Sequence, residues 1–93
     1  MLEMNDILCM NEDIILRCVN DKFWALNTQN GNQYHINSVT YDILSAIDAH
    51  SSVDSIIKAV SKDYDVSAEI FEADALQLLS SSIEKGIVMK QRR

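Results

Sequence analysis

The sequence predicts an α+β fold: a three-stranded antiparallel sheet followed by three helices. Short β-branched and aromatic runs, separated by turn residues, occupy the first part of the 93-residue chain. In the second part, apolar residues recur at the three-and-four spacing of amphipathic helices, and Ser or Asn precedes each stretch. A chain of 10.5 kDa has room for one modest core, so we expect a single domain.

The first two strands are predicted from alternating side chains. Residues 14–19 form a short, β-branched run whose side chains alternate between two faces. Asn20-Asp21 is a turn signal. Residues 23–27 follow as a run rich in aromatic surface, which favours a second strand. We therefore expect a hairpin between residues 14 and 27.

The third strand is predicted over residues 33–37, after a second turn signal. Asn30-Gly31 supplies the two positive-φ residues that a tight hairpin turn prefers. A two-residue turn would place Asn27 opposite Tyr34. A longer loop would shift the register by one and exchange the faces of the pairing. The sequence leaves both registers open.

The first two helices are recognised by their capping residues and apolar stripes. The first begins at Asn37 or Ser38 and is expected to run to about Ala49. Ser51 or Ser52 caps the second, whose first turn carries an acidic residue that suits the helix dipole. The apolar stripes are Val39, Ile43, Leu44 and Ile47 in the first helix, and Val53, Ile56, Ile57, Val60 and Tyr64 in the second.

The third helix is predicted between Ser67, as its cap, and Gly86, which ends it. Residues 87–89 are expected to return as a brief extended segment. The stripe of this helix contains Phe71, Ala75, Leu78, Leu79 and Ser82, widened by Leu76 and Ile83.

The ends of the chain lack a clear period. We expect residues 1–12 to be a loosely ordered lead-in, residues 13–89 to form the domain, and residues 90–93 to be a C-terminal tail. The two cysteines, Cys9 and Cys18, are too few for a disulfide framework and are expected to be reduced.

Charge and hydropathy exclude several partners. The net charge is −6, and the one basic group is Lys90, Arg92 and Arg93 at the C-terminus, so nucleic acid is not expected to bind. No run approaches the roughly 18 apolar residues of a membrane span, and the acidic N-terminus does not resemble a signal peptide. We therefore expect a cytoplasmic protein without a membrane partner.

Catalytic, metal-binding and cofactor-binding patterns are also lacking in the sequence. His35 and His50 stand fifteen residues apart, with no other ligands at metal-binding spacing. The two glycines, Gly31 and Gly86, do not form a phosphate loop, and no serine has a recognisable base. The sequence predicts no catalytic residue, no metal and no cofactor, so the protein is not expected to be an enzyme.

An open sheet edge is the functional feature that the predicted fold contains. In a meander, the strand over residues 33–37 lies at one margin, and it has no Pro or Lys to block further pairing. A peptide can add a strand to such an edge and place alternate side chains in a neighbouring groove. Alternatively, the edge is covered within the chain or pairs with a second copy.

Three segments with their order and spacing carry a family resemblance: residues 33–37, residues 52–57, and residues 78–87 ending on Gly86-Ile87. Over residues 14–88 the chain resembles the PqqD-like family. These small domains recognise the precursors of ribosomally synthesised and post-translationally modified peptides (RiPPs). The resemblance implies a winged-helix-like peptide chaperone that binds the leader segment of a precursor and presents it to a maturation enzyme.

The resemblance also implies a site and partners. The leader would pair antiparallel with the third strand and lie against the third helix. The separate enzyme would be a radical-SAM enzyme or a lasso-type peptidase, and the chain would be a monomer or a homodimer. The peptide-binding residues expected from strand and helix are Gln33, Tyr34, His35, Ile36, Asn37, Phe71, Asp74, Ala75 and Leu78.

Two other functions compete with leader binding. A winged-helix protein that binds nucleic acid would use its third helix, but that helix carries Glu69, Glu72, Asp74 and Glu84 against Lys85. A module that only docks to a protein, without a peptide ligand, stays open at this point.

Overall fold

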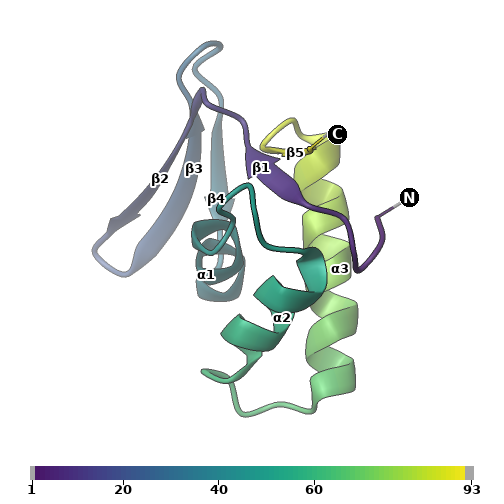
Figure 1. Cartoon of the computed structure of the whole chain (residues 1–93). Coiled ribbons are helices and arrows are strands. Elements are labelled where there is room, and N and C mark those ends of the chain that lie inside the picture. Colours follow the sequence, from purple (N-terminus) through teal and green to yellow (C-terminus); the bar gives the residue numbers. More distant parts are fainter. Residues whose placement is uncertain (1, 92–93) are drawn as a thin grey trace.

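The computed structural model describes residues 2–91 and confirms the α+β prediction. The sheet β2–β3–β4 is antiparallel and precedes three helices, and β1 and β5 form a second, two-stranded sheet that was not predicted. In Figure 1, α3 runs along one side of the molecule, and α1 and α2 lie between it and the larger sheet. The elements are β1 (Leu8–Met10), β2 (Ile14–Val19), β3 (Lys22–Asn27), β4 (Gln33–Ile36), α1 (Ser38–Ser45), α2 (Val53–Ser61), α3 (Ala68–Glu84) and β5 (Val88–Lys90).

The hairpin between β2 and β3 has a two-residue turn. Val19 lies opposite Lys22, and the turn residues Asn20 and Asp21 have φ values of 51° and 62°. Asn and Asp tolerate this left-handed conformation better than other non-glycine residues, so the turn matches the twist of the strands.

The connection between β3 and β4 is longer than a tight turn. The Asn27 side chain accepts hydrogen bonds from the backbone N–H groups of Gln29 and Asn30, at 2.9 and 3.3 Å, and these bonds hold the loop. Tyr34 therefore lies opposite Ala25 rather than Asn27. The register differs by two residues from that of a tight turn, not by one, and a shift of two keeps the faces of the strands unchanged.

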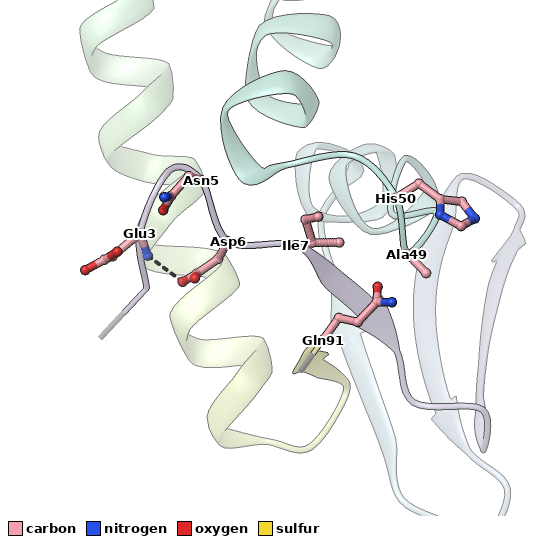
Figure 2. Close-up of a pocket in the computed structure, with 7 residues that line it drawn as sticks. All are labelled: Glu3, Asn5, Asp6, Ile7, Ala49, His50 and Gln91. Atoms are coloured by element: carbon pink, nitrogen blue, oxygen red, sulfur yellow. Dashed lines mark hydrogen bonds between the residues drawn. The ribbon is translucent and has the colours of Figure 1, made fainter. Parts of the chain in front are cut away.

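The N-terminal segment is structured, which differs from the loosely ordered lead-in that the sequence suggested. β1 pairs with β5, and Leu8 is fully buried. The backbone N–H of Gln91 donates to the carbonyl of Ile7 at 2.8 Å, and Figure 2 shows these two residues at the margin of the sheet. A strand of three residues has no detectable period, and its partner lies at the other end of the chain, so no local pattern marks it.

The predicted C-terminal tail also begins inside an element. Lys90 is the last residue of β5, and its Nζ lies 3.3 Å from Oδ2 of Asp6. Met1, at the start of the expected lead-in, and Arg92 and Arg93, of the expected tail and basic group, lie outside the described residues.

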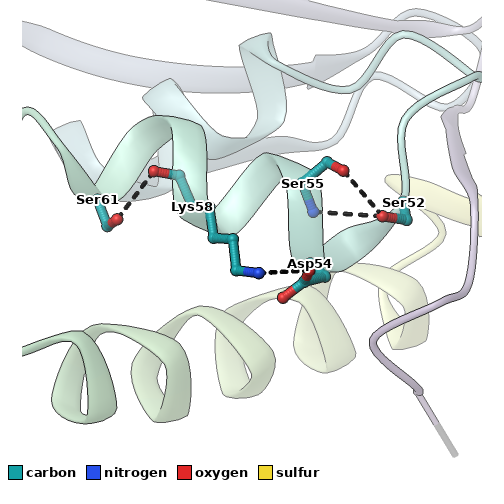
Figure 3. Close-up of polar contacts among 5 residues, drawn as sticks. All are labelled: Ser52, Asp54, Ser55, Lys58 and Ser61. Carbon is teal, nitrogen blue, oxygen red and sulfur yellow. Dashed lines mark hydrogen bonds and ion pairs between the residues drawn. The ribbon is translucent and has the colours of Figure 1, made fainter.

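The predicted helix caps are confirmed. The side chains of Asn37, Ser52 and Ser67 accept hydrogen bonds from the N–H groups of Thr40, Ser55 and Ile70. Figure 3 shows the Ser52 cap on α2, together with the ion pair between Lys58 and Asp54 at 3.0 Å.

α1 is shorter than predicted and ends at Ser45 rather than near Ala49. The Asp48 carboxylate accepts hydrogen bonds from the N–H groups of His50 and Ser51, at 2.9 and 2.7 Å. Ala49 takes a left-handed φ of 67°. Because of this local turn, the helix ends before the apolar pattern, which continues to Ile47.

The core lies between the helices and the two sheets. Across residues 2–91, no helix has both the length and the apolar content needed to cross a membrane. The buried hydrophobic residues come from every element except β2 and β4 and from the position before β5: Leu8, Ala25, Ile43, Leu44, Val53, Ile56, Ile57, Val60, Phe71, Ala75, Leu79, Ile87 and Val88.

Candidate functional site

β4 has an open edge. In the sheet it pairs with β3 on one side, and no other strand of the described chain lies on its second side. The N–H of Asn27 donates to the carbonyl of Asn32 at 2.8 Å, so this opposed pair is of the hydrogen-bonded type. Such pairs alternate along an antiparallel ladder. By this alternation, the N–H and C=O groups of Gln33 and His35 point away from β3 and are available to another strand.

A hollow of about 200 Å³ lies beside this edge, between β4 and α3. We call it the β4–α3 groove. Its apolar lining comes from both elements and from the residue before β5. Its polar lining comes from His35 of β4, from the cap and first turns of α1, and from the end of α3. The lining residues are Tyr34, His35, Ile36, Asn37, Thr40, Leu78, Ser81, Ser82, Lys85 and Ile87.

Helical spacing explains how α3 serves both core and groove. Leu78, Ser81 and Lys85 follow one another at three and four residues, so they lie on one face of the helix. Phe71 and Leu79 are 4% and 0% exposed and belong to the core. The lining is therefore the half-buried margin of the wide apolar stripe.

The polar groups of the groove have distinct positions. Ser82 is buried, and its hydroxyl donates to the carbonyl of Leu78 at 2.9 Å. Lys85 Nζ lies 5.7 Å from the centroid of the Tyr34 ring, within the range of a cation–π contact. On the outer face of the sheet, the rings of Trp24 and His35 are 4.8 Å apart. The groove thus combines an apolar lining with one exposed cation.

The structure brings together five of the nine residues that the sequence suggested for peptide binding. Tyr34, His35, Ile36, Asn37 and Leu78 line the groove. The other four do not.

Of these four, Gln33 lies on β4 with an exposed side chain and offers its backbone only. Phe71 and Ala75 are 4% and 1% exposed, so their side chains are part of the core. Asp74 is exposed and outside the lining.

Sequence reasoning missed the rest of the lining. Lys85 follows Leu78 at seven residues, the spacing of two helical turns, and this spacing could have indicated it. Thr40 and Ile87 come from neighbouring elements and carry no such pattern. The missed lining residues are Thr40, Ser81, Ser82, Lys85 and Ile87.

Two larger hollows, of about 540 and 580 Å³, lie around the β1–β5 sheet. Figure 2 shows the first, where the N–H of Glu3 donates to Asp6 at 2.8 Å. Asp6 lines both hollows and already pairs with Lys90. The Asp6 carboxylate is thus already paired, whereas the β4–α3 groove adjoins backbone groups of β4 that no strand of the described chain pairs with. We therefore place the candidate site in the smaller hollow.

Neither metal-ligand clusters nor groups with a shifted pKa indicate a second candidate site. Within residues 2–91, no group of three or more His, Cys, Asp or Glu side chains could hold a metal ion. Burial and a hydrogen bond to Asp42 raise the pKa of Tyr64. Backbone N–H donors lower the pKa of Asp6 and Asp48. None of these groups lines the groove.

A family model described as coenzyme PQQ synthesis protein D (PqqD) matches residues 24–88, which is well over half of the chain. The chain belongs to the PqqD family. The matched segment of this PqqD-family protein begins in β3 and ends in β5, so it includes β4, α3 and the groove between them. No curated protein matches the sequence.

Solved structures share the fold at low sequence identity. The PqqD truncation of Methylobacterium extorquens PqqCD, described as a functional, stand-alone RiPP recognition element, aligns with a TM-score of 0.80 at 20% identity, covering 96% of this chain and 95% of that one. TbiB1 in complex with the TbiA(β) leader peptide aligns with a TM-score of 0.74 at 18% identity, covering 90% and 98%. Lasso peptide synthetase B1 complexed with the leader peptide aligns with a TM-score of 0.74 at 17% identity, covering 88% of this chain and 96% of that one.

Proposed function

We propose that this PqqD-family protein binds the leader segment of a RiPP precursor as an added antiparallel strand on β4, against α3. The observation that carries the proposal is the open edge of β4 beside the β4–α3 groove. Two proteins of the same fold are described as complexes with leader peptides, which supports this class of ligand.

Backbone pairing alone is too weak to explain binding. Gln33 and His35 together offer two donors and two acceptors, and each hydrogen bond contributes about 0.5 to 1.5 kcal/mol net. Ordering a flexible leader offsets most of this sum. Apolar side chains of the leader must therefore fill the groove beside Ile36 and Leu78. Two or three such side chains, at roughly 1.5 to 3 kcal/mol each, are consistent with micromolar to nanomolar binding.

The bound leader would be presented to a separate maturation enzyme, a radical-SAM enzyme or a lasso-type peptidase, in the cytoplasm. The chain itself would act without catalysis or a cofactor, as a monomer or homodimer. Nucleic acid is disfavoured as the ligand because the net charge is −6 and α3 carries Glu69, Glu72 and Asp74.

The test is a titration with synthetic peptides that cover the N-terminal half of a candidate precursor, taken from any short open reading frame found beside this gene. Trp24 is the one tryptophan of the chain and contacts His35 on β4, so its fluorescence should report strand addition. Ile36→Asp and Leu78→Asp should each weaken binding at least 10-fold, about 1.4 kcal/mol, because a carboxylate would be buried among apolar groups.

The matched control is Ile15→Asp. Ile15 is 45% exposed on β2, outside the groove, so the same change should leave affinity within about 2-fold of the wild type. Thermal melts must show that all three variants are folded. Unchanged affinity in folded Ile36→Asp and Leu78→Asp would remove the site.

A further inference from the structure

Lys85 differs from the other Lys, Arg, Asp and Glu residues because it lines the β4–α3 groove. Of the lining residues, it is the one Lys or Arg, and the lining holds no Asp or Glu. The whole chain carries 14 acidic against 8 basic residues. No carboxylate of residues 2–91 lies within ion-pair distance of Lys85. The groove therefore contains a cation without a counter-ion, in an otherwise acidic protein.

The direction of α3 determines the order in which an added strand would pass Leu78 and Lys85. β4 and α3 run in opposite directions (Figure 1), and Lys85 Nζ lies 5.7 Å from the centroid of the Tyr34 ring. Leu78 comes seven residues before Lys85, so it lies about 10.5 Å back along the helix, towards Ile36. A strand that is antiparallel to β4 would pass Leu78 first and Lys85 second.

Strand geometry converts this distance into a sequence spacing. Side chains on one face of an extended peptide recur every second residue, about 6.7 Å apart. A distance of about 10.5 Å along the helix falls between two and four residues of such a strand. A ligand side chain near Lys85 is thus two or four positions after one that contacts Leu78.

We propose that the β4–α3 groove selects leaders in which Asp or Glu follows an apolar anchor by two or four residues, and that Lys85 pairs with this carboxylate. The inference rests on the proposed function and names the chemistry of the ligand. A fully exposed ion pair changes affinity less than about 5-fold. Lys85 is an exposed residue that lines the groove and lies over the Tyr34 ring, so we expect a contribution of about 2- to 5-fold that falls at high salt.

The test is a display selection of random 12-residue peptides against the full chain. Peptides enriched by the wild type should carry Asp or Glu two or four positions after an apolar residue. Selection against Lys85→Glu should lose this preference and enrich Lys or Arg at the same offset. Lys62→Glu is the matched control, because it makes the same charge change at an exposed residue after α2 and should keep the wild-type pattern.

A purely structural role of Lys85 has a different signature. Lys85 caps the C-terminus of α3, where a cation favours the helix dipole. Lys85→Arg should keep the acidic preference and Lys85→Gln should abolish it, with both variants folded in thermal melts. A peptide enriched by the wild type should bind Lys85→Gln about 2- to 5-fold more weakly in 50 mM salt than it binds the wild type.

The outcomes separate the inference from the proposed function. Peptides whose enrichment depends on Ile36 but shows no acidic preference would overturn the role of Lys85 and leave leader binding intact. An acidic preference that persists in Lys85→Glu would do the same. No enrichment by the wild type would overturn both proposals.

Discussion

The strands β4 and β5 both face α3, but β5 packs directly on the helix, whereas β4 is separated from it by the β4–α3 groove. Ile87, just before β5, and Val88, its first residue, are 2% and 1% exposed and belong to the core. Tyr34 and Ile36 on β4 are only partly buried and line the groove. The two strands thus have different roles: β5 completes the core, and β4 leaves space for a ligand.

The difference follows from how each strand is connected. The N–H of Ile87 donates to the carbonyl of Ser82 at 2.9 Å, so the chain returns directly onto α3 after the turn at Gly86. β1 then pairs with β5 and covers its other side with Leu8. β4 instead leads through Asn37 into α1, and no segment of the described chain pairs with its outer edge.

The largest effect is expected at the covered strand. Leu8→Ala should lower the free energy of unfolding by about 2 to 5 kcal/mol, because Leu8 is fully buried and the change leaves a cavity. Urea denaturation followed by circular dichroism measures this loss. Leu26→Ala is the control, since Leu26 is half-buried on β3 and should cost less. A loss below about 1 kcal/mol for Leu8→Ala would mean that β1 is not part of the stable domain.

The next effect concerns the open edge itself. His35→Pro removes an N–H that points away from β3, so the sheet keeps its ladder while an added strand loses a donor and meets the proline ring. The affinity for the leader peptide should fall about 10-fold or more. Calorimetry measures it, because this variant lacks the ring that contacts Trp24.

Cys18→Pro is the matched change on β2. By the same alternation, the N–H of Cys18 points away from β3, but no groove residue is near it. The affinity of the Cys18→Pro variant for the leader peptide should equal that of the wild type. Equal losses in the two proline variants would show that the edge of β4 has no special role and that proline acts through the stability of the sheet.

The contrast between β4 and β5 also explains which parts of the fold could be predicted from the sequence: local features could, and pairings between distant segments could not. Caps at Asn37, Ser52 and Ser67 depend on hydrogen bonds over three residues, so local patterns predicted them correctly. The pairing of β1 with β5 joins the two ends of the chain, and no local pattern contains it. The register of β4 depends on the side chain of Asn27, which a tight-turn rule ignores.

The candidate site divides in the same way. The open edge could be predicted, because strand order and the absence of Pro and Lys are visible in the sequence. The helix face could not be divided into core and groove, because the stripe of α3 is wide. Phe71 and Ala75 proved to be core, and Lys85 proved to line the groove. The position of β4 relative to α3 determines which residues of the helix line the groove, and the sequence alone does not give this position.

The smallest effect is expected from the ion pair between Asp6 in the N-terminal segment and Lys90 in β5. The N–H of Glu3 and the ammonium group of Lys90 both contact the Asp6 carboxylate and hold its pKa below the usual value. A carboxyl group whose pKa is lower in the folded state stabilises the protein above its unfolded pKa of about 3.9. This stabilisation is lost as the pH falls through the folded-state pKa.

Asp6→Asn should therefore lower the urea midpoint slightly at pH 7, and its difference from the wild type should shrink as the pH falls below about 4. Asp65→Asn controls for the lost charge, because Asp65 is exposed and makes no hydrogen bond or ion pair within residues 2–91. A difference that stays constant down to about pH 3 would show that the contacts of Asp6 do not stabilise the charged carboxylate. Leader affinity at pH 7 should be unchanged in Asp6→Asn, because Asp6 lies outside the β4–α3 groove.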